Sequence, residues 1–313
     1  MKEPLAAWLD RDSLDALWLR VLRRPIEPHE REETEARLAA GLSRTRLLRE
    51  LVESAEFEHA LRLDDAVAWA AAQRRAGERP RNVEAPPGTD ERPVEIPWCL
   101  ARYGGEQRVL DVGYAFAEPA YLVGLLDLGA PELVGVDLAR ADVPGLESVQ
   151  ADLRALPFGD GEFGVAFAIS TLEHVGRDNA QYGLAREDDD GSLDAALREL
   201  RRVSARLLVT VPTGEGEALP EQAVLSPEEW VERFERAGFI VFEDELYELT
   251  DAGWRSVPQL SPGLRYGERG PGASAVLCAE LRPRSLGERL RLAVRDLRHG
   301  NEVRRVTGSD APK

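Results

Sequence analysis

The stretch 108–137 constrains the fold of this chain most, because it predicts a strand, a tight turn, a helix and a second strand in succession. Residues 109–113 are a short apolar run closed by a glycine, which is the pattern of a buried parallel strand. Pro119 stands where the first turn of a helix is expected. A second apolar run follows at residues 133–136. This succession predicts an α/β sheet with parallel strands.

The same stretch also predicts a ligand site. Asp137 ends the second strand, and Gly113 ends the first. Open α/β sheets hold a nucleoside with a turn of small residues after one strand and an acid after the next, whose carboxylate accepts the ribose hydroxyls. The dinucleotide fingerprint G-x-G-x-x-G is absent, because Tyr-Ala-Phe-Ala follows Gly113. The sequence therefore predicts a nucleoside-binding edge with a variant turn.

Strand and helix patterns continue to alternate after Asp137. Five more strands are expected, at residues 148–151, 164–169, 206–211, 239–249 and 274–281, and of these residues 164–169 form a continuous apolar run. Helices are expected at residues 193–203 and between Ser226 and Gly238. The total is seven strands with interspersed helices, which predicts a doubly wound, Rossmann-like sheet.

Residues 1–75 predict a small all-α domain in front of this sheet. Ser13 and Ser43 are suited to cap helices, and apolar residues recur at helical spacing. These apolar stripes are expected to form a core, and no pattern of catalytic residues accompanies them. The domain resembles a family similar to phycobilisome-linker domains, which implies an interaction module with a protein partner. The resemblance rests on residues 14–25, 41–44 and 51–57.

The sheet domain, residues 98–283, is flanked by two segments of different composition. Residues 76–97 contain five prolines and predict an extended linker without a helix, whose end docks on the sheet domain. Residues 284–313 form an arginine-rich tail. A helix packed on the domain or a frayed end is the preferred interpretation, and an amphipathic helix that touches a membrane or a partner is the alternative.

Composition narrows the classes of partner. The net charge of -17 disfavours nucleic acid and anionic lipid surfaces. No apolar run approaches the ~20 residues that a membrane-spanning helix needs. Cys99 and Cys278 lack metal-ligand spacing and predict reduced thiols in the cytoplasm. We therefore expect a cytoplasmic protein with a small-molecule or sugar partner, no nucleic acid and no stable membrane insertion.

Four motifs, in this order and spacing, resemble class I S-adenosylmethionine-dependent methyltransferases, of the methyltransferase type 11-like kind. They are residues 109–113, 135–137, 151–158 and 163–175. The resemblance covers about residues 94–282 and implies S-adenosylmethionine as the cofactor. The segment 170–176, followed by Tyr182 and an acidic loop, is similar to a bacterial subgroup that tailors cell-surface glycans or small metabolites.

The resemblance also implies which residues bind the cofactor. They are Asp111, Gly113, Tyr114, Ala115, Glu118, Asp137, Leu138, Asp152, Leu153 and Ser170. The turn after the first strand would hold the methionine portion, with Glu118 reaching its amino group. Asp137 would accept the ribose hydroxyls, and Leu138, Asp152 and Leu153 would contact the adenine.

Glu173 and His174 are the candidate catalytic residues. Methyl transfer from a sulfonium needs mainly alignment and exclusion of water, and a general base only when the acceptor must lose a proton. Histidine suits that task near neutral pH. The alternative makes Glu173 a helix-terminus acid and His174 an orienting or packing residue. The acidic run 187–190 has the carboxylates that suit Mg²⁺ or Ca²⁺, but a solvated loop is the preferred interpretation and no metal is expected.

Three functions compete at this point. The first is methyl transfer, to oxygen, on a small molecule or sugar. The second is an inactive methyltransferase-like scaffold, because Ala115 and Ala117 add methyl groups where the cofactor's tail would pass, although Tyr114 and Phe116 can form an aromatic wall there. The third is another nucleotide-using enzyme such as a dehydrogenase, which the missing fingerprint disfavours.

Overall fold

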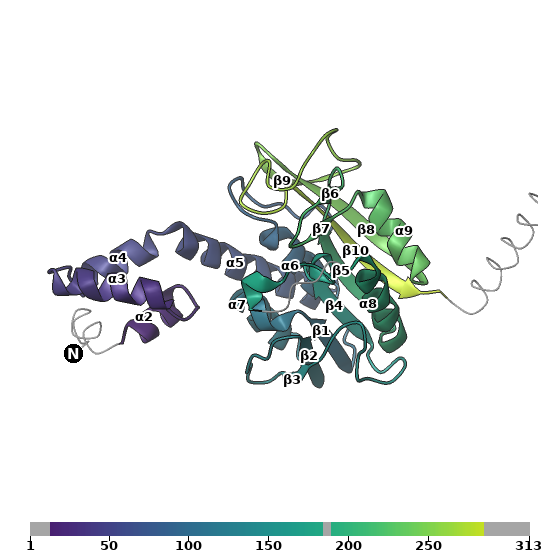
Figure 1. Ribbon diagram of the computed structural model, residues 1–313, viewed down its shortest axis with the longest axis horizontal. Helices are drawn as coiled ribbons and strands as arrows, with labels where there is room; N and C mark the ends of the chain where they lie inside the picture. Colours follow the sequence, from purple (N-terminus) through teal and green to yellow (C-terminus); the bar gives the residue numbers. More distant parts are fainter. Residues whose placement is uncertain (1–12, 184–188, 285–313) are drawn as a thin grey trace, which may run out of the picture.

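The computed structural model describes residues 13–183 and 189–284, and an eight-stranded sheet forms its centre (Figure 1). The strand order is β3-β2-β1-β4-β5-β10-β8-β9. Strands β1 to β5 pair in parallel, and β10 is antiparallel to both of its neighbours. The strands are β1 (Arg108–Val112), β2 (Glu132–Asp137), β3 (Glu147–Gln150), β4 (Val165–Ile169), β5 (Leu207–Pro212), β8 (Phe239–Thr250), β9 (Gly253–Val257) and β10 (Ala275–Pro283). A separate pair is formed by β6 (Glu217–Ala218) and β7 (Ala223–Val224).

All seven predicted strands are present, which confirms the doubly wound sheet, and β9 joins them as an eighth. β9 pairs with β8 as an antiparallel hairpin at the edge of the sheet. Its tight turn ends at Gly253, whose φ of +99° lies in the left-handed region that favours glycine. The chain moves outward from β1 to β3 and then returns to β4 beside β1. The strand order therefore reverses between β1 and β4, and such a reversal opens a crevice at the carboxyl ends of the strands.

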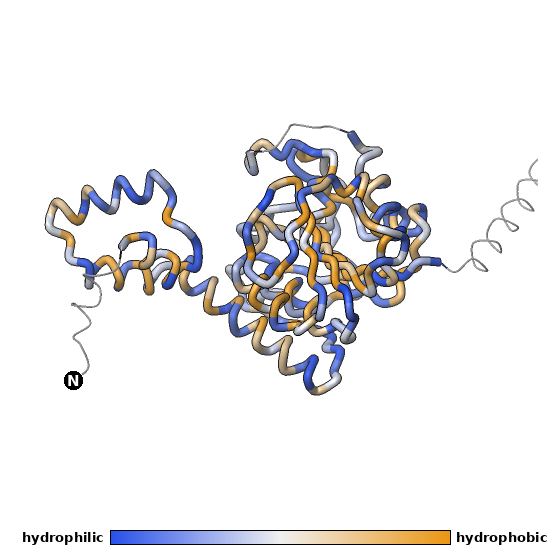
Figure 2. The backbone as a smooth tube through the Cα atoms, turned by 90° about the horizontal axis from the view of Figure 1, so that it is seen from below, coloured by the Kyte–Doolittle hydropathy of each residue, from blue (hydrophilic) through white to orange (hydrophobic). Residues whose placement is uncertain are grey.

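Helices cover both faces of the sheet. They are α2 (Leu14–Val21), α3 (Pro28–Ala39), α4 (Arg44–Val52), α5 (Ala55–Arg75), α6 (Arg92–Leu100), α7 (Pro119–Leu126), α8 (Asp190–Val203) and α9 (Pro227–Arg236). One core lies between the sheet and α5, α6 and α7, and a second lies between the sheet and α8 and α9. Figure 2 shows the apolar segments gathered in the interior of this domain. The two cores fix the sheet rigidly, so the loops at its carboxyl edge are held in place.

The N-terminal helices α2, α3 and α4 share a small core of their own beside the sheet domain (Figure 1). Ser13 and Ser43 cap α2 and α4 as predicted. Helix α5 then runs on into the sheet domain, where Val67 packs in the core next to α6 and α7. A Cβ on Gly124 of α7 would lie 2.7 Å from Val67, so the helices approach closely at this glycine. Among the described residues, no helix is long and apolar enough to cross a membrane.

The prediction that residues 76–97 contain no helix is wrong, because α6 begins at Arg92. Pro93 lies in the first turn, where its missing N–H is not needed, and Pro97 lies inside the helix. Every residue from Pro93 to Leu100 is buried, so tertiary packing overrides the low helix propensity of proline. The Trp98 side chain is fully buried, and its indole N–H donates to Glu245 over 2.9 Å. The docking of this segment on the sheet domain, which the sequence predicted, is therefore achieved by a helix.

The arginine-rich tail lies outside the described residues except for Arg284. The backbone N–H of Arg284 donates to the carbonyl oxygen of Gly238 over 2.9 Å, directly after α9. The described chain thus ends where β10 meets the start of β8.

Candidate functional site

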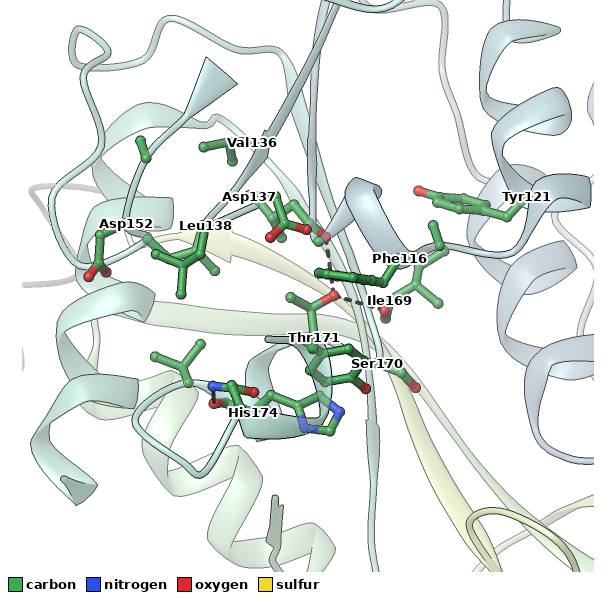
Figure 3. Close-up of a pocket in the computed structure, with 18 of the residues that line it drawn as sticks. Phe116, Tyr121, Val136, Asp137, Leu138, Asp152, Ile169, Ser170, Thr171 and His174 are labelled. Carbon is green, nitrogen blue, oxygen red and sulfur yellow. Dashed lines mark hydrogen bonds between the residues drawn. The ribbon is translucent and has the colours of Figure 1, made fainter. Parts of the chain in front are cut away.

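A cavity of about 200 Å³ opens at the carboxyl ends of β1, β2 and β4 (Figure 3). This is the reversal point of the sheet, where open α/β folds bind ligands. The β2–β3 end of the cavity is lined by Asp137, Leu138, Asp152 and Leu153. The β1–β4 end is lined by Arg92, Glu118, Ser170 and Thr171. Six of the twelve residues predicted to bind a ligand or act in catalysis belong to these two sets.

Gly113 forms the floor between the two ends. Its φ of +87° lies in the left-handed region, and its N–H donates to the carbonyl oxygen of Val136 over 3.0 Å. A Cβ at this position would clash with the Thr171 side chain. The Thr171 hydroxyl lies 3.1 Å from the Val112 carbonyl oxygen and 3.0 Å from that of Ile169. The glycine is therefore needed both for the turn and for the contact between the loops after β1 and β4.

Asp137 is held by backbone donors at the β2–β3 end. Its Oδ1 accepts from the Ala139 N–H over 3.0 Å, and its Oδ2 accepts from the Ala115 N–H over 3.1 Å. Burial raises the pKa of this carboxyl above its ordinary value, and the backbone donors oppose that rise. The carboxylate faces the cavity and keeps free lone pairs, so it can accept two hydroxyl groups.

Asp152 carries its own counterion. Arg154 donates from its backbone N–H and from its guanidinium to both carboxylate oxygens, at 2.5–2.9 Å. These bonds lower the pKa of Asp152. Leu138 and Leu153 line the cavity beside this pair, so the β2–β3 end is a slot with apolar walls and acidic acceptors.

The β1–β4 end contains residues that the sequence did not reveal. Arg92 and Ile96 reach the cavity from α6. The Ser170 hydroxyl donates to both oxygens of Glu95, at 2.8 and 2.9 Å, and the Arg92 Nη1 donates to Glu95 Oε2 over 2.9 Å. Glu95 is fully buried, and burial raises its pKa to about 7. A sequence signal for these residues exists. Arg92 and Glu95 stand next to Ile96 and Trp98, and large apolar residues are unusual in a linker.

Ser170 has an uncommon backbone conformation, with φ of +42°. The Thr210 carbonyl oxygen and hydroxyl oxygen each lie 3.1 Å from its backbone nitrogen and accept from its N–H. A non-glycine residue in this region is sparsely populated and is kept there only by its surroundings. The strain directs the Ser170 side chain toward Glu95 at the edge of the cavity.

His174 lies on the loop after β4 with a defined tautomer. Its Nδ1 is 2.7 Å from the carbonyl oxygen of Glu221, which can only accept, so Nδ1 carries the proton. The other nitrogen, Nε2, is 4.0 Å from Glu173 Oε1. Burial lowers the pKa of His174, so the neutral ring with a lone pair on Nε2 is favoured. His174 lines the cavity, as predicted for a base.

An aromatic pair stands at the cavity between the loops after β1 and β4. The rings of Phe116 and Tyr182 lie 4.8 Å apart, and Tyr182 also meets the His174 ring edge-on at 5.8 Å. Half of the Phe116 side chain is exposed. The aromatic wall expected from the sequence therefore exists, but it is formed by Phe116 with Tyr182.

Four predicted site residues do not line the cavity. Asp111 is buried under it and accepts from the Tyr121 hydroxyl. Tyr114 is fully buried beside Gly135, where a Cβ would lie 2.8 Å from its ring, so its predicted place in the wall is wrong. Ala115 contributes only its backbone N–H to Asp137. Glu173 is buried behind His174, and burial raises its pKa to about 8.

The acidic run 187–190 lies only partly within the described residues. Residues 184–188 lie outside the described residues. Asp189 accepts from the Gly191 N–H over 3.0 Å and caps α8. No group of three metal-ligating side chains that could hold an ion is found in the described ranges.

Part of the chain is similar to known proteins. A family model described as a methyltransferase domain matches residues 110–206. Among solved structures, an S-adenosylmethionine-dependent methyltransferase from Thermotoga maritima, described as a possible histamine N-methyltransferase, is 16% identical. The similarity covers 61% of this chain and 88% of that chain, with a TM-score of 0.39. Curated protein sequences give no match.

A second solved structure shares the similarity. It is the Burkholderia thailandensis 1,6-didemethyltoxoflavin-N1-methyltransferase, with bound 1,6-didemethyltoxoflavin and S-adenosylhomocysteine. It is 13% identical, and the similarity covers 84% of this chain and 92% of that chain, with a TM-score of 0.39.

The cavity suits the cofactor of that family. Asp137 presents free acceptor lone pairs for ribose hydroxyls, and Leu138 and Leu153 present apolar walls for a flat base. Charged side chains at the β1–β4 end suit a zwitterionic amino acid. The chain therefore contains a methyltransferase domain over residues 110–206, and S-adenosylmethionine is the cofactor that its cavity suits.

Proposed function

We propose that this enzyme transfers a methyl group to a hydroxyl oxygen of a small-molecule or sugar acceptor, in bacterial tailoring of a metabolite or glycan. The observation that best supports this proposal is the tautomer of His174. Its Nδ1–H is committed to the Glu221 carbonyl oxygen, which leaves the lone pair of Nε2 available to take a proton. A hydroxyl must lose its proton to become a good nucleophile, so a fixed neutral imidazole suits this acceptor.

The bound cofactor supplies an activated methyl group on a sulfonium. The protein's own work is to bind, orient and exclude water. Asp137 and Asp152 hold the nucleoside, and the Phe116–Tyr182 pair covers the cavity. Enclosure in this way keeps water from the reacting atoms.

In this proposal the Glu173 carboxyl supports His174 as its buried neighbour. Its Oε1 lies 4.0 Å from His174 Nε2, and its Oε2 is buried with no hydrogen-bond partner among the described residues. When His174 Nε2 takes the acceptor's proton, the imidazolium has the Glu173 carboxyl 4.0 Å away, and the proton stays on His174. Glu173 is thus a positioning residue that acts through His174.

We also propose a cytoplasmic location for the enzyme and a protein partner for its N-terminal helices. Cys99 and Cys278 are both buried and free, which supports the predicted cytoplasmic location. Leu19 on α2 and Val52 at the end of α4 are exposed, at 59% and 39%, which supports a protein partner for the N-terminal helices. Comparing the partners of the wild-type chain with those of a Leu19→Asp variant would test that role.

The test is a screen with methyl-labelled S-adenosylmethionine against sugars, phenols and small alcohols, each with its amine counterpart. We expect labelled ethers from hydroxyl acceptors and a fall in kcat of about 10²- to 10⁴-fold in His174→Gln. S-adenosylhomocysteine should bind both proteins equally. Because burial lowers the His174 pKa from its ordinary 6.5, wild-type activity should persist below pH 6.5 and fall once the ring protonates.

Two outcomes would contradict the proposal. Methylation confined to amines, with His174→Gln fully active, would exclude a hydroxyl acceptor and a base at this position. Tight cofactor binding without any methylated product would favour the inactive scaffold instead.

A further inference from the structure

The geometry of the sheet fixes how the cofactor lies in the cavity. Asp137 and Asp152 line the β2–β3 end, which holds the nucleoside in the proposed function. The carboxyl ends of β3, β2, β1 and β4 follow one another across the sheet. The amino-acid portion must therefore extend past Gly113 toward the β1–β4 end, where its carboxylate needs a cation.

Two arginines are the cationic candidates among the described cavity-lining residues. Arg154 lies at the β2–β3 end and is committed to Asp152 by four hydrogen bonds. Arg92 lies at the opposite end and reaches the cavity from α6. The only fixed positive charge near the amino-acid portion is thus Arg92, as far as the described residues show.

Arg92 is held so that part of its guanidinium remains available. Nη1 donates to Glu95 Oε2 over 2.9 Å, and Glu95 is itself fixed by Ser170. This is the only hydrogen bond of the Arg92 side chain within the described ranges. A guanidinium has five N–H donors in a planar fork, so Nη2 and Nε can serve a second carboxylate. The first carboxylate, Glu95, orients that fork.

We propose that Arg92 binds the carboxylate of the methionine portion of S-adenosylmethionine. Arg92 lies outside residues 110–206, the segment that the family model matches, so this contact belongs to α6 of this chain and not to the matched motifs. The proposal rests on the cofactor and is independent of the acceptor. Helix α6, and not an extended linker, thereby completes the cofactor site.

The neighbours of Arg92 explain why a cation is stable there. Glu91, Glu95 and Glu173 are all buried close to it, and their charges favour the charged guanidinium. Because burial raises the pKa of Glu95 to about 7 and that of Glu173 to about 8, both are partly ionised near neutral pH, and a free anion would add to this negative charge. A zwitterion that brings an ammonium with its carboxylate is accommodated better, with Glu118 at the same end for the ammonium.

Calorimetry with two commercial ligands tests the proposal. S-adenosylhomocysteine has the amino-acid portion, whereas 5′-methylthioadenosine lacks it. In Arg92→Gln, affinity for S-adenosylhomocysteine should fall by about 10- to 100-fold, as expected for a charge-assisted hydrogen bond. Affinity for 5′-methylthioadenosine should stay within about threefold of wild type. Arg92→Lys, which keeps the charge but loses the fork, should fall in between.

Arg154→Gln is the matched control, because it removes an arginine from the other end. Whatever affinity it loses should be lost equally for both ligands. An Arg92→Gln variant that binds S-adenosylhomocysteine like wild type, or that loses both ligands equally while unfolding at the wild-type temperature, would overturn the proposal. So would an Arg92→Gln variant altered only in acceptor KM, since Arg92 would then serve the acceptor. These readouts use binding, so failure to find an O-methylated product would not be confused with them.

Discussion

Asp152 and Glu95, at opposite ends of the cavity, have pKa values that are shifted in opposite directions. At the β2–β3 end, pairing with Arg154 lowers the pKa of Asp152. At the β1–β4 end, burial raises the pKa of Glu95 to about 7 although Arg92 is next to it. The same chemical group is therefore firmly ionised at one end and titrates near neutral pH at the other. Asp152 is therefore suited to a constant charge, and Glu95 to a charge that changes near neutral pH.

Both carboxylates have an arginine nearby in the sequence, but their other hydrogen bonds differ. Arg154, two residues after Asp152, donates to both oxygens of that carboxylate. Glu95 pairs with Arg92 three residues before it and also accepts from Ser170, 75 residues away, so its surroundings form only in the folded chain. We therefore expect the buried carboxylates at the β1–β4 end to affect the pH dependence of stability more than Asp152 does.

The largest expected effect is that of Asp111→Asn on stability. Asp111 is buried beneath the β1–β4 end, and burial raises its pKa from an ordinary 3.8 to about 8. The folded state thus keeps a proton that the unfolded state releases, so this group destabilises the fold progressively as pH rises from 4 to 8. The contribution approaches about 1.4 kcal/mol per pH unit. Asparagine is neutral in both states, so urea unfolding at pH 5 to 8 should show a flatter pH dependence and a more stable variant at pH 7.

Asp152→Asn tests whether the pH dependence of stability differs between Asp111 and Asp152. Pairing lowers the pKa of Asp152, so its contribution to stability is complete above pH 4 and is lost only in more acidic solution. The slope between pH 5 and 8 should therefore match that of wild type. If Asp111→Asn kept the wild-type slope while Asp152→Asn changed it, the assignment of the two ends would be reversed.

The β2–β3 end was predictable because its residues follow strands directly in the sequence. Asp137 and Asp152 come at the ends of apolar runs, and parallel strands bring their carboxyl ends to one edge. The seven strands were predictable because each contains a short group of apolar residues bounded by turn or helix signals, although residues 239–249 also include four acids. Strand β9 was not predicted because residues 253–257 include Gly253, Arg255 and Ser256, which interrupt the apolar pattern of a strand.

The β1–β4 end was not predictable, because burial and proline outweighed local pattern there. Five prolines predicted an extended segment, yet complete burial of Ile96 and Trp98 stabilises α6 and brings Arg92 to the cavity. Tyr114 was assigned to the wall from its place after Gly113. Only the structure shows that Gly135, in the neighbouring strand, makes room for its ring below the cavity.

The next effect in size is that of Asp137→Ala on binding. The Asp137 carboxylate is the acceptor expected to hold the ribose, which both S-adenosylhomocysteine and 5′-methylthioadenosine contain. We expect affinity for each to fall by the same factor, about 10- to 100-fold, measured by calorimetry. Arg92→Gln is expected to weaken the binding of S-adenosylhomocysteine alone. The two variants together therefore show which end of the cavity binds which portion of the ligand. A loss confined to S-adenosylhomocysteine in Asp137→Ala would place the amino-acid portion at the β2–β3 end.

The smallest effect should come from Phe116→Ala, because the Phe116–Tyr182 pair covers the cavity and belongs to neither end. The ring of Phe116 is half exposed, and its contact with Tyr182 at 4.8 Å is worth about 1 kcal/mol. That energy corresponds to about fivefold, and we expect it as faster release of both ligands in stopped-flow measurements. Tyr182→Phe keeps both rings and should release them at the wild-type rate. A selective loss of one ligand in Phe116→Ala would mean that the ring contacts that end directly, and the separation of the cavity into two ends and a shared cover would no longer hold.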